Sequence, residues 1–328
     1  MKLIATLAIS ALAATTAFAD GHQDRTGWPE SFTVATASQG GTYFAYGSGW
    51  ANLVAEELGL TGGGEVTGGP GQNMALVHTG DAQFGMTTMG PAAEAIAGLS
   101  PIAPGLAMTN ACAMFPMYQT PFSVTALSSS GITSIAEIPA GSRIGFGPAG
   151  STSDTYFPRM METLGVEFDR RNGSWSDLGG QLQDGLIDVI AFAAGVPVPA
   201  VSQLEVQTDV NIIEFTQAEQ ATIMGAFPVA PFDIAASTYS TLEADARSVS
   251  MWNFAIANCD LPDSMVNAVV DIIMSDNERM MNIHKAARST LPENWTKNAG
   301  VIAWHPGAAQ WFIDNAGADI PADQIHSK

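Results

Sequence analysis

Two segments of the chain combine glycine with hydroxyl residues at a spacing that could bind an anion. They are residues 38–43 and residues 147–153, and each follows a predicted strand and precedes a predicted helix. Glycine lets the backbone approach a ligand closely, while the first helical turn offers N–H groups and a partial positive charge. Such a helix end can bind a carboxylate without an arginine. Each segment alone is more typical of an ordinary strand–helix turn with a Ser or Thr cap, and the anion site gains equal weight only from the pair, one in each proposed lobe.

Other chemistry has less support in the sequence. Residues 145–150 match G-x-G-x-x-G, and Glu167 and Asp169 follow at a spacing suited to a ribose contact, so a periplasmic dinucleotide-using oxidoreductase is an alternative. Pro148 removes a backbone N–H from this loop, however, which weakens the match. Hydrolase motifs are missing and the five histidines are scattered. We therefore predict a protein that is not an enzyme and that uses no metal and no cofactor.

The chain has two cysteines, Cys112 and Cys259. In an oxidising compartment they could form a disulfide, but two separate buried thiols are equally compatible with the sequence. The spacing matches no structural zinc motif. The sequence leaves the state of the cysteines open.

Composition limits the possible partners. The 328 residues are 46% hydrophobic and 13% charged, and 12 Lys and Arg face 32 Asp and Glu, for a formal net charge of -20. Nucleic-acid binding depends on basic residues, so no nucleic-acid partner is expected, and an anionic membrane surface is an equally poor partner. The apolar content also excludes intrinsic disorder. The length favours two domains.

The N-terminus has the pattern of a secretory signal peptide. A basic start precedes a short apolar run, and Ala17-Phe18-Ala19 gives a small-x-small cleavage site, so we expect residues 1–19 to be removed after Ala19. The apolar run is too short for a membrane span, and no later segment qualifies. We predict a periplasmic protein that is not itself embedded in the membrane.

Alternating strand and helix patterns predict an α/β fold with two lobes, each a mostly parallel sheet flanked by helices, with a ligand cleft between them. The glycine-rich residues 61–71 are predicted to form a loop, and a helix is expected to begin near Asn73. Pro116 and Pro121 interrupt a strand-like pattern over residues 105–127. We expect residues 20–118 to form the first part of lobe 1, 119–250 to form lobe 2, and 251–328 to return to lobe 1 with C-terminal helices.

Several short motifs occur in the order found in one family. The chain resembles the TAXI-type solute-binding proteins of tripartite ATP-independent periplasmic (TRAP) transporters over nearly its whole length after the signal peptide. Thr88-Met89-Gly90 and residues 227–231 depart from the family pattern, which leaves the ligand open. The matching segments are residues 37–43, 67–73, 80–86, 147–151, 184–188, 194–197 and 305–308.

The resemblance implies a two-lobed receptor that closes on a small organic acid or amino acid. From the two helix turns we predict a small carboxylate of the 2-oxoglutarate, glutamate or C4-dicarboxylate type, and we expect the receptor to be a monomer. It would deliver this ligand to TRAP permease subunits in the membrane, which an ion gradient drives. An exported sensor or scaffold that acts through a partner protein is a further alternative. The ligand-binding residues implied are Gly41, Thr42, Tyr43, Gln72, Asn73, Thr88, Ser151, Thr152, Ser153 and Gly195.

Overall fold

The computed structural model describes residues 24–328, so the predicted signal peptide lies outside the described residues. The strands form one ten-stranded sheet in the order β2-β1-β3-β10-β4-β7-β5-β6, with β8 beside β4 and β9 beside β10. The strands are β1 (Ser31–Ala35), β2 (Thr61–Glu65), β3 (Phe84–Thr88), β4 (Ala111–Leu127), β5 (Ser142–Gly145), β6 (Phe168–Arg171), β7 (Val189–Ala193), β8 (Val210–Ile213), β9 (Ala230–Ile234) and β10 (Ala246–Asn258).

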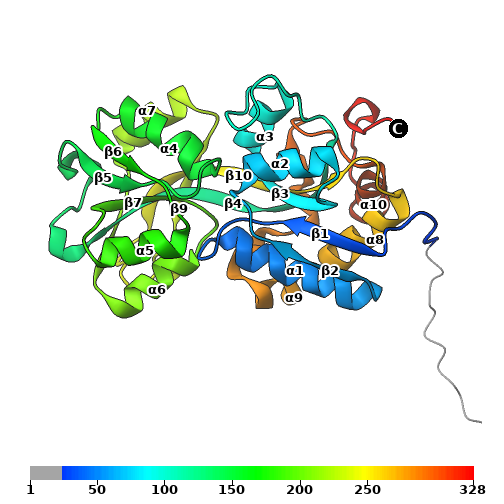
Figure 1. The fold of residues 1–328 in the computed structure, drawn as a ribbon, viewed down its shortest axis with the longest axis horizontal. Helices are drawn as coiled ribbons and strands as arrows, with labels where there is room; N and C mark the ends of the chain where they lie inside the picture. The colour runs from blue at the N-terminus through cyan, green and yellow to red at the C-terminus, as the bar shows by residue number, and fades with distance from the viewer. Residues whose placement is uncertain (1–23) are drawn as a thin grey trace, which may run out of the picture.

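Two long strands, β4 and β10, join the two ends of the molecule (Figure 1). On one side, a single hydrophobic core contains residues from 32–118 and from 254–320, and we call this half lobe 1. On the other side, two core clusters contain only residues from 122–251, and we call this half lobe 2. The predicted boundaries at residues 118/119 and 250/251 fall inside β4 and β10, so these strands contribute to both lobes.

The two-lobed α/β architecture is confirmed, and strand direction adds one detail. In lobe 1, β1 pairs in parallel with β2 and β3, and in lobe 2, β5 pairs in parallel with β6 and β7. The crossing strands β4 and β10 are antiparallel to their neighbours. The part of the sheet in each lobe is therefore mixed, because β4 and β10 run through both lobes in opposite directions.

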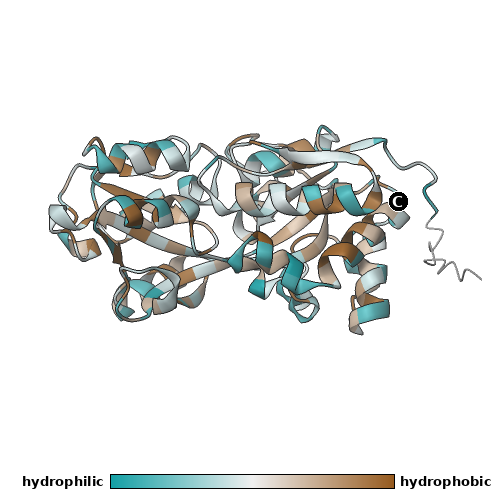
Figure 2. Ribbon diagram, turned by 90° about the horizontal axis from the view of Figure 1, so that it is seen from below, coloured by the Kyte–Doolittle hydropathy of each residue, from teal (hydrophilic) through white to brown (hydrophobic). Residues whose placement is uncertain are grey.

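Helices cover both faces of the sheet in each lobe (Figure 1). Figure 2 shows hydrophobic and hydrophilic residues alternating along these surface helices, as expected when one side of a helix packs on a sheet. The helices are α1 (Thr42–Leu58), α2 (Pro70–Thr79), α3 (Met89–Ile96), α4 (Thr152–Thr163), α5 (Trp175–Gln183), α6 (Pro199–Gln207), α7 (Gln217–Ala226), α8 (Asp263–Met274), α9 (Asn277–Ile283) and α10 (Pro306–Ala316).

The structure corrects the prediction of a loop over residues 61–71. This stretch contains β2, and α2 begins at Pro70, three residues before the expected start. Glycine is required in this strand because a Cβ on Gly62 would lie 2.2 Å from the ring of Phe32 on the neighbouring strand. A rule that treats glycine as a loop former cannot detect such close packing between strands.

The prolines in residues 105–127 do not end the strand. Pro116 pairs with Phe254 beside a register shift between β4 and β10, and Pro121 pairs with Ser250. A bulge accommodates a residue that has no backbone N–H, which explains how the strand continues through Pro116.

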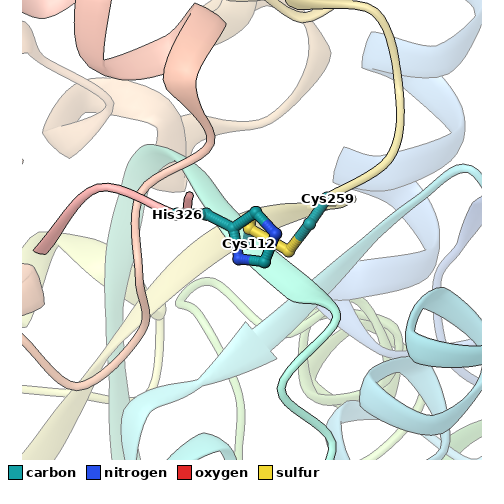
Figure 3. Close-up of side chains that lie close together, drawn as sticks. All are labelled: Cys112, Cys259 and His326. Atoms are coloured by element: carbon teal, nitrogen blue, oxygen red, sulfur yellow. A yellow bond between two sulfur atoms is a disulfide. The ribbon is translucent and has the colours of Figure 1, made fainter. Parts of the chain in front are cut away.

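Cys112 and Cys259 form a disulfide in lobe 1, with their Cα atoms 5.2 Å apart. They lie near one end of β4 and just after β10. The ring of His326 lies beside the two sulfur atoms (Figure 3), but sulfur in a disulfide is not a thiolate and does not ligate a metal. Within residues 24–328, no helix is long and apolar enough to cross a membrane.

Candidate ligand-binding site

A cavity lies between the two lobes, beside the crossing strand β4. The empty space between its walls is about 370 Å³, which includes the part open to solvent. The centre of a water molecule can occupy only about 30 Å³. The cavity is therefore narrow in this conformation. It is lined by Ala37, Gly41, Thr42, Tyr43, Gly68, Gly69, Pro70, Thr88, Thr120, Pro148, Ser151, Thr152, Trp175, Ala193 and Ala194.

Five helices begin at this cavity. In lobe 1 these are α1, α2 and α3, whose N-cap residues Gly41, Gly69 and Thr88 make no side-chain capping bond. In lobe 2, α4 begins after Ser151 and α5 begins at Trp175. In lobe 2 the N-cap side chains of Ser151 and Ser174 each accept one N–H of the first turn, from Asp154 and Asp177. The remaining N–H groups of a helix start carry a partial positive charge. The arrangement therefore concentrates positive potential in one small space.

Among the residues that the structure describes, no charged side chain lines this cavity. The polar groups of its wall are backbone, the hydroxyls of Tyr43 and of Ser and Thr residues, and the indole N–H of Trp175. Burial raises the pKa of Tyr43, so its phenol stays neutral. The site can bind a small anion through helix dipoles and neutral donors alone.

A buried hydroxyl network supports one wall of the cavity. Asn253 on β10 accepts bonds at Oδ1 from Tyr43 Oη at 2.6 Å and from Thr88 Oγ1 at 2.9 Å. Its Nδ2 donates to Thr120 Oγ1 at 2.8 Å. Across the cleft, the hydroxyls of Thr88 and Thr152 lie 2.8 Å apart. One amide thereby holds side chains from α1, β3 and β4 in fixed positions.

Backbone contacts close the cleft on both sides of the cavity. The N–H of Ala200 donates to Gly40 O at 3.0 Å, and the N–H of Gly71 donates to Gly150 O at 3.4 Å. The hydroxyl of Thr42 donates to the carbonyl oxygen of Gly195. Since each bond joins the two lobes, the structure describes a closed conformation.

Six of the ten predicted site residues line the cavity, and four do not. Gln72 is exposed, and its Oε1 accepts from Gly68 N at 2.7 Å. Asn73 is fully buried and donates to Thr36 O at 2.7 Å and Met86 O at 2.8 Å, so its amide connects backbone segments within lobe 1. The six that line it are Gly41, Thr42, Tyr43, Thr88, Ser151 and Thr152.

The other two predicted residues act on the cavity wall from outside it. Ser153 Oγ accepts the N–H of Ala193 at 2.6 Å, and Gly195 accepts the bond from Thr42. A Cβ on Gly195 would lie 2.3 Å from the ring of Tyr118, so this position has no room for a side chain. Both residues position parts of the wall.

Sequence reasoning missed Thr120, Trp175 and Asn253. The ring of Trp175 stacks on Phe192 at 4.5 Å between centroids and closes one side of the cavity. A sequence signal existed for Asn253, which is the only amide in the apolar run of residues 251–257. Nothing in the sequence around Thr120 distinguishes it from other threonines of the strand.

The loop that matched a dinucleotide fingerprint is occupied by the protein's own groups. A Cβ on Gly147 would lie 2.4 Å from the ring of Trp175, which packs against this turn. The N–H of Gly150 donates to Asp154 Oδ2 at 2.9 Å. A pyrophosphate has no open approach to these backbone groups in this conformation, so the geometry disfavours the oxidoreductase alternative.

Comparison with solved structures identifies the fold. The periplasmic binding protein BugD is 17% identical and aligns over 88% of this chain and 99% of its own, with a TM-score of 0.58. The malate-bound protein MatC from Rhodopseudomonas palustris is 13% identical and aligns over 87% of this chain and 99% of its own, with a TM-score of 0.58. An adipate-bound protein from R. palustris is 16% identical and aligns over 88% of this chain and 98% of its own, with a TM-score of 0.57. At these identities the likeness shows a shared fold.

No curated protein matches the chain. One family matches residues 34–315, which is most of the sequence and spans both lobes. This family is broader than the TAXI-type receptors that the sequence resembles. The narrower assignment stays a prediction. The chain belongs to the NMT1-like family.

Proposed function

We propose that this protein is an extracytoplasmic solute receptor that captures a small organic acid anion between its lobes. The observation that carries the proposal is the convergence of five helix starts on one interlobe cavity without charged side chains. Short-range N–H donors and helix dipoles hold a carboxylate there, even though the chain's net charge is -20. Salt screens the distributed surface charge, but it screens a buried contact much less.

Two structures with the same fold contain dicarboxylates, adipate in one and malate in the other. They support a carboxylate as the ligand class of this chain. Because the cavity of the closed conformation is narrow, we infer that the ligand enters when the lobes separate and is enclosed when they close. The resemblance to TAXI-type receptors supports delivery to a TRAP permease in the membrane.

Thermal unfolding of the purified protein against a panel of carboxylates and neutral solutes tests this function. A true ligand at 1,000 times its dissociation constant stabilises the folded state by about 4 kcal/mol. At roughly 2–4 °C per kcal/mol, this gives a clear shift of the unfolding midpoint. We expect a shift with chemically related acids only. A panel in which only neutral solutes shift the midpoint would refute the anion site.

A pair of variants separates charge from size. Ala37 lines the cavity and is 8% exposed. Ala37→Asp places a carboxylate among the helix starts, whereas Ala37→Asn adds a neutral side chain of nearly the same shape. We expect Ala37→Asp to lose at least tenfold more affinity for the acid than Ala37→Asn, measured by calorimetric titration. Equal losses in the two variants would show that positive potential does not hold the ligand.

A further inference from the structure

The orientation of the Asn253 amide is fixed by the backbone. Its Nδ2 donates to the carbonyl oxygen of Tyr118 at 2.7 Å, and a carbonyl can only accept. Oδ1 therefore faces the hydroxyls of Tyr43 and Thr88. Asn253 is fully buried, so no water competes for these bonds.

Three hydroxyl groups donate to the oxygen of this amide. An amide oxygen has two lone pairs, and the two shortest bonds to Oδ1 come from Tyr43 at 2.6 Å and Thr88 at 2.9 Å. Thr120 Oγ1 donates to Oδ1 at 3.1 Å and accepts from Nδ2 at 2.8 Å. The bond from Thr120 to Oδ1 is the longest of the three and therefore the one most easily replaced. Because Thr120 lines the cavity, its proton can turn to a ligand instead.

The same cavity favours an anion over a cation. Its described lining contains no Asp or Glu, while five helix starts direct partial positive charge into it. A buried ammonium group without a carboxylate partner is costly, and nearby positive dipoles increase that cost. An oxo, hydroxyl or carboxylate oxygen, in contrast, accepts a hydrogen bond from Thr120.

We propose that the site selects organic acids whose second polar group is a hydrogen-bond acceptor, that it rejects the α-amino acids of matching size, and that Thr120 recognises the acceptor. This inference rests on the proposed function and narrows its ligand class. Asn253 acts as a positioning residue, because it directs the proton of Thr120 without lining the cavity itself.

Matched ligand pairs test the selectivity by calorimetric titration of the purified protein. The pairs are pyruvate and L-alanine, L-malate and L-aspartate, and 2-oxoglutarate and L-glutamate. In the pair that fits the cavity, we expect the oxo or hydroxy acid to bind at least tenfold more tightly. If an amino acid binds as tightly as its partner, the selectivity proposal is overturned while the carboxylate receptor stands. If none of the six binds, the proposed function fails with it.

Three variants test Thr120 itself. Thr120→Val removes the donor and should lower affinity for the preferred acid about tenfold, whereas Thr120→Ser keeps the hydroxyl and should keep the affinity. Thr125→Val is the matched control, because Thr125 lies buried on the same strand, outside the cavity, and its hydroxyl has no partner. Thermal melts confirm that each variant is folded. Unchanged affinity in folded Thr120→Val would overturn the assignment.

Discussion

Gly41 lies where the two lobes meet beside the cavity. Its backbone has an ordinary extended conformation, with φ of -95°, so an L side chain fits there without backbone strain. A Cβ at this position would nevertheless lie 2.8 Å from Cδ1 of Trp175 in lobe 2. The absence of a side chain at Gly41 is therefore a requirement of the closed cleft and not of the fold of lobe 1.

We expect Gly41→Ala to weaken ligand binding while leaving the unliganded protein folded. Overpacking costs about 1–3 kcal/mol, which corresponds to a loss of affinity of roughly 5- to 150-fold. Gly180→Ala is the control, because a Cβ on Gly180 in α5 would have no atom within 4 Å, so this variant should gain slight stability without a change in affinity. Calorimetric titration and urea unfolding of both variants measure the two effects. Equal affinity in Gly41→Ala and the unmodified protein would contradict this account of closure.

At the residue scale, the sequence predicts those parts of the site that lie in one segment. Gly41, Thr42 and Ser151 were found because glycine and hydroxyl residues stand together before a helix. Thr120 and Asn253 could not be found this way, because their roles depend on the pairing of β4 with β10 and on contacts with α1. Such contacts join residues more than a hundred positions apart.

At the scale of single elements, α10 depends on an uncharged histidine. His305 is its N-cap, and Nδ1 accepts the N–H of Gly307 at 3.2 Å. Nε2 lies 3.2 Å from the carbonyl oxygen of Leu261, which requires a proton on that nitrogen. Burial lowers the pKa of His305 to about 4, mainly through lost hydration and also through the nearby Lys328 ammonium, although Asp263 at 3.8 Å favours the charged form.

This geometry predicts a specific pH dependence of stability. The unfolded chain binds a proton at His305 below a pKa of 6.5, whereas the folded protein binds it only near 4. Stability is therefore greatest above pH 6.5 and falls by up to about 3 kcal/mol as the pH decreases to 4. His305→Asn keeps a capping oxygen without this titration, so its urea unfolding free energy should depend less on pH in that window. Identical slopes in both proteins would refute this role.

Elements were predicted best where their pattern is local. The strand and the helix predicted on either side of each glycine–hydroxyl segment are present, as β1 and α1 around residues 38–43 and as β5 and α4 around residues 147–153. The strand β2 was missed, since three consecutive glycines carry no strand signal of their own. Its partner β1 supplies the packing that determines its conformation.

At the scale of the whole molecule, an ion pair joins the lobes outside the cavity. Glu94 on α3 of lobe 1 accepts bonds from Arg159 Nη2 at 3.0 Å and Tyr156 Oη at 3.1 Å, both on α4 of lobe 2. The guanidinium of Arg159 also lies over the ring of Tyr156, 4.4 Å from its centroid. The two bonds to Glu94 exist only when the lobes are together, so they stabilise the closed form.

We expect Glu94→Ala to lower ligand affinity by up to about fivefold, because exposed ion pairs contribute about 0.2–1 kcal/mol. The affinity of the unmodified protein should also fall more steeply with salt than that of the variant. Glu57→Ala is the control, since Glu57 pairs with Arg279 at 2.6 Å within lobe 1. Titrations at low and high salt measure both effects. A loss of affinity of the same size in Glu57→Ala would contradict a role in closure.

The path of the chain also determines an order of assembly. The core of lobe 2 uses residues 122–251, one uninterrupted stretch, whereas the core of lobe 1 joins residues 32–118 to residues 254–320. Lobe 2 is therefore complete in sequence before the sheet of lobe 1 receives its last strand partner, β10. Cys259 follows that strand, so the covalent link to Cys112 joins two parts of lobe 1 that remain separate until all of lobe 2 has been made.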